Sequence, residues 1–318
     1  MHDVSLRLPF REYRTWTVDS RRWEHYRPRE GDVIVATYPK SGTTWTQRII
    51  SLLIFKSAEV YPLDKTFPWW EFRAGLPIED VVAAFENRTL QRSVKTHLPL
   101  DGLPLFENVK YIHVARDPRD ACLSYQNHTT GFTPEALAQM SEIGLADETL
   151  RKPYPRVSTD PAEFFHQWLT EGSIAGQSDG MPFLSYFEYE KTFWDCRHLK
   201  NILFVHYRDL SADLVGEMER IARFIGVDLP RARLVELAQE ANFDSMQRDG
   251  GSLIPETAKT FEGGAERLFH KGQSGRWRSF FKGDDLQLFE HKLRQALPPD
   301  YGRWLIEGRL SGVDPALS

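Results

Sequence analysis

Residues 38–45 (YPKSGTTW) combine a positive charge, a glycine and several hydroxyl groups. They follow an apolar run and precede a helical pattern, so backbone N–H groups at this turn point outward and can cradle a phosphate or a sulfate. Lys40 adds a point charge, and Gly42 lets the backbone approach an anion closely. Hydroxyl donors accompany them at Ser41, Thr43 and Thr44. The segment predicts an anion site, although a tight turn with a capping serine or threonine uses the same residue types.

A second candidate anion site lies in residues 111–124 (YIHVARDPRDACLS). Arg116 ends an apolar run just before a helix start, where the helix dipole and a guanidinium both favour an anion. Ser124 follows about two helical turns later. An ion pair of Arg116 with Asp117 or Asp120 is the alternative. Arg119 could join the anion site or be a solvated helix charge.

A third segment, residues 95–99 (KTHLP), ends a short predicted strand and contains a lysine and a histidine. Residues two apart on a strand point to the same face, so Lys95 and His97 can enter one pocket. A positioned histidine can accept a proton from a hydroxyl during group transfer. The chain has 10 histidines, and a single histidine is more often structural than catalytic.

Four apolar, β-rich runs precede or contain these segments, at residues 33–38, 92–96, 109–115 and 202–206. A helix pattern covers residues 43–56. Asp117 with Pro118 and Asp160 with Pro161 predict two further helix starts, the second with Glu163 in a capping box. Ser211 is expected to begin a helix that ends at Gly226.

Strands alternating with helices predict an α/β fold with a central parallel sheet, helices on both faces and a nucleotide cleft at the carboxyl ends of the strands. Residues 131–160 are loosely patterned and suggest a mobile flap, and residues 250–275 suggest a long functional loop. We expect one domain over residues 1–318.

The composition limits the classes of function that the chain can have. The chain has 318 residues, 41% hydrophobic and 27% charged, and a formal net charge of -5, which argues against bulk nucleic-acid binding. Cys122 and Cys196 could pair, but are expected to be reduced core thiols. There is no signal-peptide pattern and no apolar run long enough to span a membrane, so a cytoplasmic protein is expected. We see no metal-ligand spacing.

The string YPKSGTTW resembles the 5'-phosphosulfate loop of cytosolic sulfotransferases that use 3'-phosphoadenosine-5'-phosphosulfate (PAPS). The resemblance implies that Lys40 contacts the bridging oxygen and sulfuryl group, that residues 41–44 hold the 5'-phosphate, and that Trp45 stacks on adenine. Arg116 and Ser124 match the family's 3'-phosphate residues in type and spacing. From the residues alone, packing of Trp45 in the core is the alternative.

The segment KTHLP resembles the family's catalytic segment, which implies that His97 is the general base and that Lys95 assists at the developing charge. Lys40 would stabilise the leaving 5'-phosphate. Such a transfer needs mainly alignment and charge stabilisation, and neither a covalent enzyme intermediate nor a metal.

Residues 269–277 (FHKGQSGRW) resemble the family's RKGxxGDW segment, which closes over the 3'-phosphate. Lys271 and Gly272 match, whereas His270 replaces an arginine and Arg276 an aspartate, which leaves the part these two play open. Tyr207 and Phe243 match residues near the adenine, with core packing as the alternative. Ala241 replaces a threonine. The resemblance spans about residues 30–285 and is strongest to bacterial members, including glycolipid and aryl sulfotransferases.

An aromatic cluster in a predicted loop suggests the acceptor site. We expect an apolar pocket near His97, suited to a small apolar, phenolic or glycolipid-type acceptor. The side chains expected to line it are Phe67, Trp69, Trp70, Phe164, Phe165 and Trp168. Burial of these aromatic side chains beneath the loop is the alternative.

Two other functions fit parts of the sequence. A nucleotide kinase with an atypical phosphate loop would use Mg²⁺, held by Asp117 or Asp209. In this chain, however, the lysine precedes the glycine, unlike the order in GxxxxGK[ST]. A non-catalytic protein that binds PAPS or its product, 3',5'-adenosine bisphosphate (PAP), would not need His97.

Overall fold

The computed structural model describes residues 5–317, and its centre is a four-stranded parallel sheet. The strand order is β3-β2-β5-β6, which confirms the predicted fold class. The strands span Val33–Thr37 (β2), Ser93–Thr96 (β3), Lys110–Ala115 (β5) and Ile202–His206 (β6). A separate antiparallel pair joins β1 (Ser5–Arg7) to β4 (Leu105–Phe106).

Strand order sets where a ligand can bind. The chain leaves β2 for β3 on one side, then crosses to β5 on the other side of β2. In open parallel sheets this reversal creates a crevice beyond the carboxyl ends of the strands. The segments that follow the four strands begin at Tyr38, His97, Arg116 and Tyr207, so the predicted site residues meet at one edge of the sheet.

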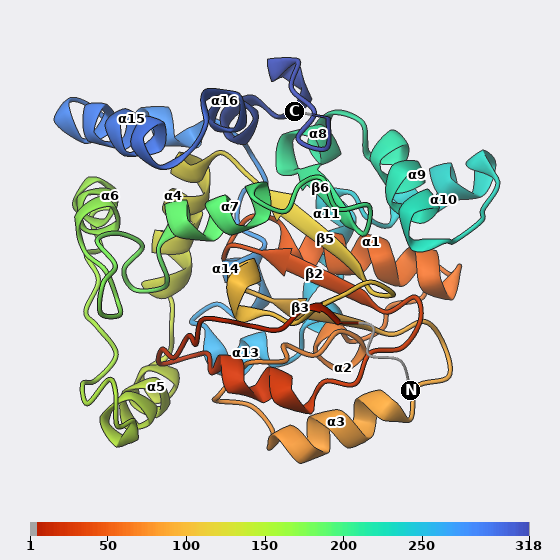
Figure 1. The fold of residues 1–318 in the computed structure, drawn as a ribbon, viewed down its shortest axis with the longest axis horizontal. Helices are drawn as coiled ribbons and strands as arrows, with labels where there is room; N and C mark the ends of the chain where they lie inside the picture. Colours follow the sequence, from red (N-terminus) through yellow and green to blue (C-terminus); the bar gives the residue numbers. More distant parts are fainter. Residues whose placement is uncertain (1–4, 318) are drawn as a thin grey trace.

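Alternate strand residues pack on opposite faces of the sheet, and helices cover both (Figure 1). Val33 and Val35 belong to the core shared with one group of helices: α1 (Thr43–Phe55), α9 (Leu214–Ile225) and α10 (Arg231–Gln239). Ile34 and Ala36 belong to the larger core on the other face. The helices there are α4 (Pro118–Thr129), α6 (Pro161–Thr170), α7 (Tyr186–Trp194), α15 (Asp284–Ala296) and α16 (Pro299–Glu307).

The remaining helices are mostly short. They are α2 (Leu63–Thr66), α3 (Ile78–Glu86), α5 (Pro134–Ala146), α8 (Tyr207–Ala212), α11 (Phe243–Arg248), α12 (Gly250–Leu253), α13 (Thr257–Thr260) and α14 (Ala265–Leu268). No helix within residues 5–317 is both long and apolar enough to cross a membrane.

Three of the four predicted helix starts are confirmed and one is wrong. The helix predicted from residue 43 is α1. The Asp117 and Asp160 side chains cap α4 and α6. The Asp160 N–H, however, donates to the Ser158 hydroxyl, so Glu163 does not complete a capping box. Ser211 begins no helix, because it lies inside α8 and its hydroxyl bonds back to the Tyr207 carbonyl. Asp213 caps α9 instead, and Gly226 ends it in the left-handed conformation.

Two segments predicted as loops are more ordered than their patterns indicate. Residues 131–160 contain the whole of α5, where Met140 packs with Trp16 and Tyr154. Residues 250–275 contain three single-turn helices, α12 to α14. Phe132 pairs with Phe261 in an antiparallel bridge, which joins the two segments. Both cysteines are free, as expected, although Cys196 is only partly buried.

Candidate active site at the strand ends

A cavity of about 1490 Å³ lies at the carboxyl ends of the strands. Nearly all the side chains selected from the motifs line it: Lys40, Gly42, Thr43, Thr44, Trp45, Lys95, His97, Arg116, Ser124, Tyr207, Phe243, Lys271 and Gly272. His270 and Arg276 line it too. The Ser41 hydroxyl does not, since it is fully buried without a hydrogen-bond partner. The cavity is therefore built from all four strand ends and from a segment near residue 270.

The turn between β2 and α1 presents backbone donors to the cavity. Lys40 has a φ of 70° and Gly42 a φ of 108°, both in the left-handed region. Gly42 precedes α1, and no side chain caps this helix, so its first N–H groups lie at the cavity without a side-chain acceptor. A Cβ atom at Gly42 would lie 3.0 Å from the Tyr207 ring. This geometry suits a phosphate or sulfate.

The Arg116 side chain is positioned by hydrogen bonds to backbone carbonyls and by an aromatic ring, and no carboxylate of the described residues pairs with its guanidinium. Its guanidinium donates to the Lys40 carbonyl (3.2 Å) and the Gln273 carbonyl (3.0 Å) and lies over the Tyr207 ring. Its Nε has no hydrogen-bond partner. The ion pair with Asp117 or Asp120 is not formed within the described residues.

The neighbouring acidic side chains of α4 have other partners. Asp117 pairs with Arg119, whose guanidinium also lies 3.8 Å from the Trp277 ring centre. Arg119 is therefore neither a solvated helix charge nor a cavity residue, and both expectations for it were wrong. Asp120 accepts the N–H groups of Gly275 (2.5 Å) and Trp277 (3.3 Å).

His97 lies beside Thr37 because β2 and β3 are parallel neighbours and both strands end here. The His97 Nδ1 is 2.7 Å from the Thr37 carbonyl, so Nδ1 carries the proton and donates it. Nε2 is left as an acceptor that faces the cavity. Burial, with a smaller contribution from Lys95, lowers the pKa of His97 to about 3. The imidazole is therefore neutral at neutral pH, with an unprotonated Nε2. A pKa this low makes it a weak base, and an anion bound in the cavity would raise that pKa.

Two lysines lie close to this imidazole. Burial lowers the pKa of Lys40 to about 7, helped by the positive charges of Arg116 and Lys95. Burial also lowers the pKa of Lys95 to about 8, and its ammonium lies 5.0 Å from the Trp69 ring centre. Lys95 and His97 share one cavity, as their spacing predicts. An anion bound here would favour the charged form of both lysines.

Glu71 organises the loop next to His97, and its part in the site was not predicted. Its fully buried carboxylate accepts the His97 N–H (2.7 Å), the Trp69 indole N–H (2.6 Å) and the Trp23 indole N–H (3.1 Å). Burial raises the pKa of Glu71. An acidic residue among aromatic side chains is the only signal that the sequence offers.

An aromatic slot lies at the other end of the cavity. The Trp45 indole donates to the Ala241 carbonyl (2.6 Å) and meets Tyr207 edge to face. Phe243 lies against Gly272, where a Cβ atom would be 2.3 Å from the ring. Ala241 contributes its carbonyl to Trp45 and has no side-chain hydroxyl to offer a nucleotide.

Four of the six predicted acceptor residues do not line the cavity. Trp70, Phe164, Phe165 and Trp168 are fully buried in the larger core. Trp70 points to the opposite side of its loop from Trp69 and packs on Trp23, Tyr26 and Phe85. Phe165 stacks on Phe281 at 4.0 Å. Of the six, only Phe67 and Trp69 line the cavity. Phe72, at the end of the same aromatic cluster, lines it too, together with residues that were not predicted: Leu76, Val81, Phe132, Met140, Tyr154, Phe183 and Phe261.

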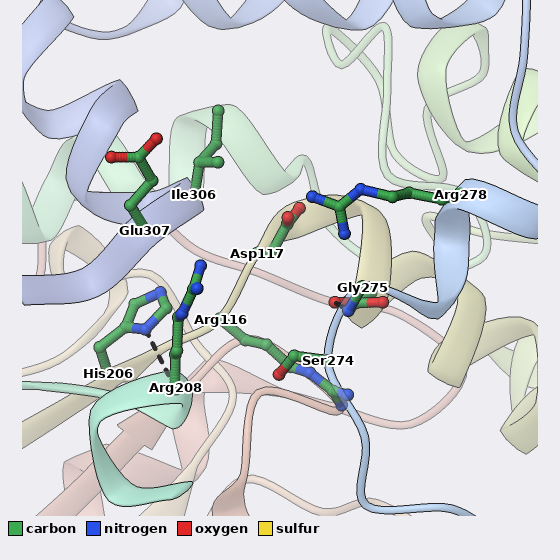
Figure 2. Close-up of a pocket in the computed structure, with 10 residues that line it drawn as sticks. Arg116, Asp117, His206, Arg208, Ser274, Gly275, Arg278, Ile306 and Glu307 are labelled. Carbon is green, nitrogen blue, oxygen red and sulfur yellow. Dashed lines mark hydrogen bonds between the residues drawn. The ribbon is translucent and has the colours of Figure 1, made fainter. Parts of the chain in front are cut away.

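A second, smaller hollow of about 220 Å³ adjoins the site. Figure 2 shows Arg116, Arg208 and Arg278 around it, with Arg278 reaching toward Asp117. Glu307 lines it as well. Within the described residues, no group of three or more histidine, cysteine, aspartate or glutamate side chains could hold a metal ion.

The fold and the cavity define an α/β protein with a basic, aromatic-ended cleft at its strand ends. Residues 30–298 match the family model described as "Sulfotransferase domain". A glycolipid sulfotransferase of Mycobacterium bovis is 35% identical over 96% of each chain. Sulfotransferase 1A1 of Bos taurus is 27% identical over 81% of each. The chain therefore belongs to the sulfotransferase family.

A solved structure agrees with the fold. Retinol dehydratase, crystallised with androsterone and the inactive cofactor PAP, matches with a TM-score of 0.67 and 24% identity. The match covers 88% of this chain and 84% of that one.

Proposed function

We propose that the protein transfers a sulfuryl group from PAPS to a hydroxyl of a small apolar, phenolic or glycolipid-type acceptor, with His97 as general base. The observation that carries this proposal is that His97 and the basic side chains of Lys40, Lys95 and Arg116 share one cavity. PAPS, when bound, supplies an activated sulfuryl group on a phosphate leaving group.

The residues present fit such a donor. The Arg116 guanidinium keeps an Nε without a partner, and Ser124 lies on α4, the helix that begins two residues after Arg116. We assign these two, with Lys271 and Gly272, to the 3'-phosphate. Lys40 and the uncapped start of α1 would hold the 5'-side, and Trp45, Tyr207 and Phe243 would hold the adenine.

His97 would take the acceptor's hydroxyl proton at Nε2, since its Nδ1 is fixed as a donor to Thr37. As the acceptor oxygen bonds to sulfur, the bond from sulfur to the 5'-phosphate oxygen breaks. Lys40 would stabilise the charge left on that oxygen, and Lys95 would assist. The glycolipid sulfotransferase relative and the apolar walls of the cavity support an acceptor with a substantial apolar part.

A kinase is less well supported. Its candidate Mg²⁺ ligands already have partners, since Asp117 pairs with Arg119 and Asp209 accepts the Arg309 N–H.

Calorimetric titration with PAP, AMP and Mg-ATP tests the donor. We expect clear preference for PAP, and at least a 10-fold loss of PAP affinity in Arg116→Ala, since a charge-assisted contact contributes about 1.5–3 kcal/mol. Arg231→Ala, at an exposed ion pair, is the matched control. Preference for Mg-ATP would overturn the proposal in favour of a kinase.

His97→Gln tests the base. We expect turnover to fall by about 10²- to 10⁴-fold, with PAP affinity nearly unchanged. Turnover equal to that of the unaltered protein would refute this assignment, even if PAP still binds.

A further inference from the structure

A second histidine, His128, lines the same cavity as His97 and belongs to none of the sequence motifs. It lies on α4, four residues after Ser124, so the two side chains share one face of the helix. Ser124 is assigned to the nucleotide end of the cavity. His128 therefore lies one turn further along, where the wall becomes aromatic.

The His128 ring is fixed by aromatic neighbours. Its centre lies 4.6 Å from that of Phe261, 5.1 Å from that of Phe132 and 6.0 Å from that of Tyr125. Phe132 and Phe261 themselves stack, and their backbones are bridged. Neither His128 ring nitrogen has a hydrogen-bond partner among residues 5–317, and neither is sealed from the cavity space. The imidazole thus presents two polar atoms to the cavity from an apolar wall.

His128 is neutral in this environment. Burial lowers its pKa well below the usual range, and the positive charge of Lys40 acts in the same direction. A neutral imidazole offers one N–H donor and one acceptor nitrogen. A hydroxyl group, which both donates and accepts, matches it, whereas the nearby lysines disfavour a cationic amine. When an acceptor displaces water from this wall, a ring nitrogen left without a hydrogen-bond partner costs binding free energy, so an acceptor that brings a hydroxyl there is favoured.

We propose that His128 hydrogen-bonds a second hydroxyl of the acceptor, near the hydroxyl that is sulfated, and so selects acceptors with a sugar or polyol head group on an apolar tail. This inference rests on the proposed function and narrows its acceptor class. The apolar tail would lie along Phe72, Leu76 and Val81, which line the cavity beyond Trp69.

The test compares two acceptors, hexyl β-D-glucopyranoside and 2-naphthol, in the unaltered protein and in His128→Phe. Phenylalanine keeps the ring packing and removes both polar atoms. We expect the ratio of kcat/KM for the glucoside to that for naphthol to fall by about 3- to 10-fold, the effect of one hydrogen bond. His128→Gln, which retains a donor and an acceptor, should recover most of the ratio. His198→Gln, at an exposed position, is the control.

An unchanged ratio, or an equal loss for both acceptors, would overturn the inference; the latter would indicate a general catalytic role for His128. If the unaltered protein sulfated neither acceptor, the proposed function would fail. Calorimetric titration of the PAP complex with the glucoside would then test whether His128 contributes to acceptor binding. Weaker binding in His128→Phe would support it, and equal or undetectable binding in both proteins would overturn it.

Discussion

Burial and mutual repulsion control the titratable side chains at the strand ends. Burial lowers the pKa of Lys40 to about 7 and that of His97 to about 3, from ordinary values of 10.5 and 6.5. For the lysine this weakens its hold on an anion at high pH. For the histidine it secures the neutral form but also weakens the imidazole as a base. The negative charges of a bound PAP would raise the pKa of Lys40, Lys95 and His97 toward their ordinary values.

PAP affinity should accordingly fall as the pH rises from 7 to 9. Above its lowered pKa the Lys40 amine is neutral in the free protein, so binding must take up a proton. One such proton changes affinity by up to about 10-fold per pH unit, and phosphate groups with a pKa near 6 are already ionised there. Calorimetry at pH 7, 8 and 9 measures this dependence. Lys40→Arg, which stays charged, should flatten it, and an equal slope in that variant would contradict the assignment to Lys40.

The residue 270 segment shows how separate elements complete the site. Arg116 contacts the Gln273 carbonyl, and Asp120 accepts the N–H groups of Gly275 and Trp277. The start of α4 thereby holds the segment over the cavity. Gly272 lies within it at a φ of 63°, against Phe243.

Gly272→Ala should weaken PAP binding by about 10-fold or more. The added methyl group would lie 2.3 Å from the Phe243 ring, so either the aromatic slot or the segment must move. Gly283→Ala is a matched control, because Gly283 has nearly the same φ of 62° but open space around its Cβ position. Calorimetry on both variants measures PAP affinity, and a thermal melt measures stability. Together they separate the steric effect of the added methyl group from the backbone strain at a positive φ. Equal PAP affinities in the two variants would show that only backbone strain matters.

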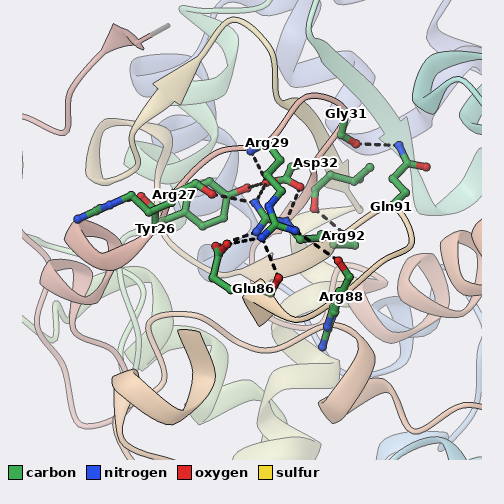
Figure 3. Close-up of polar contacts among 11 residues, drawn as sticks. Tyr26, Arg27, Arg29, Gly31, Asp32, Glu86, Arg88, Gln91 and Arg92 are labelled. Carbon is green, nitrogen blue, oxygen red and sulfur yellow. Dashed lines mark hydrogen bonds and ion pairs between the residues drawn. The ribbon is translucent and has the colours of Figure 1, made fainter. Parts of the chain in front are cut away.

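At the scale of the whole molecule, a buried network of charged side chains joins the edge strand β3 to helix α3, which contributes to the cavity wall. Figure 3 shows the residues of this network. The Arg92 side chain is 2% exposed and donates to both carboxylate oxygens of Asp32 and to Glu86. Tyr26 donates to Asp32 (2.7 Å). The network therefore connects β3, the start of β2 and the end of α3, a helix whose Val81 and Ala84 line the cavity.

Arg92→Met should lower the free energy of unfolding by about 3–5 kcal/mol, because it leaves the Asp32 carboxylate buried without its cation. Urea denaturation followed by circular dichroism measures the loss. The control is Arg231→Met, at an exposed pair with Glu219, where about 0–1 kcal/mol is expected. A loss of under 1 kcal/mol at Arg92 would mean that the network adds little to stability.

The sequence by itself determined the local parts of the protein. Apolar runs of strand length predicted β2, β3, β5 and β6, and short-range side-chain chemistry predicted the starts of α4 and α6. The order of strands and helices predicted a parallel sheet, and therefore that Lys40, His97 and Arg116 meet at one edge. These features could be predicted because they depend on residues close together in the chain, and because a parallel sheet collects its carboxyl ends.

Only the tertiary structure decided which side chains face the cavity. Trp69 and Trp70 are adjacent and chemically alike, yet one lines the cavity and the other lies in the core. Glu71 and His128 acquire their positions from partners far along the chain, such as Trp23 and Phe261. Such contacts depend on how whole elements pack. Residue type fixes what a side chain can do, but only packing fixes what it meets.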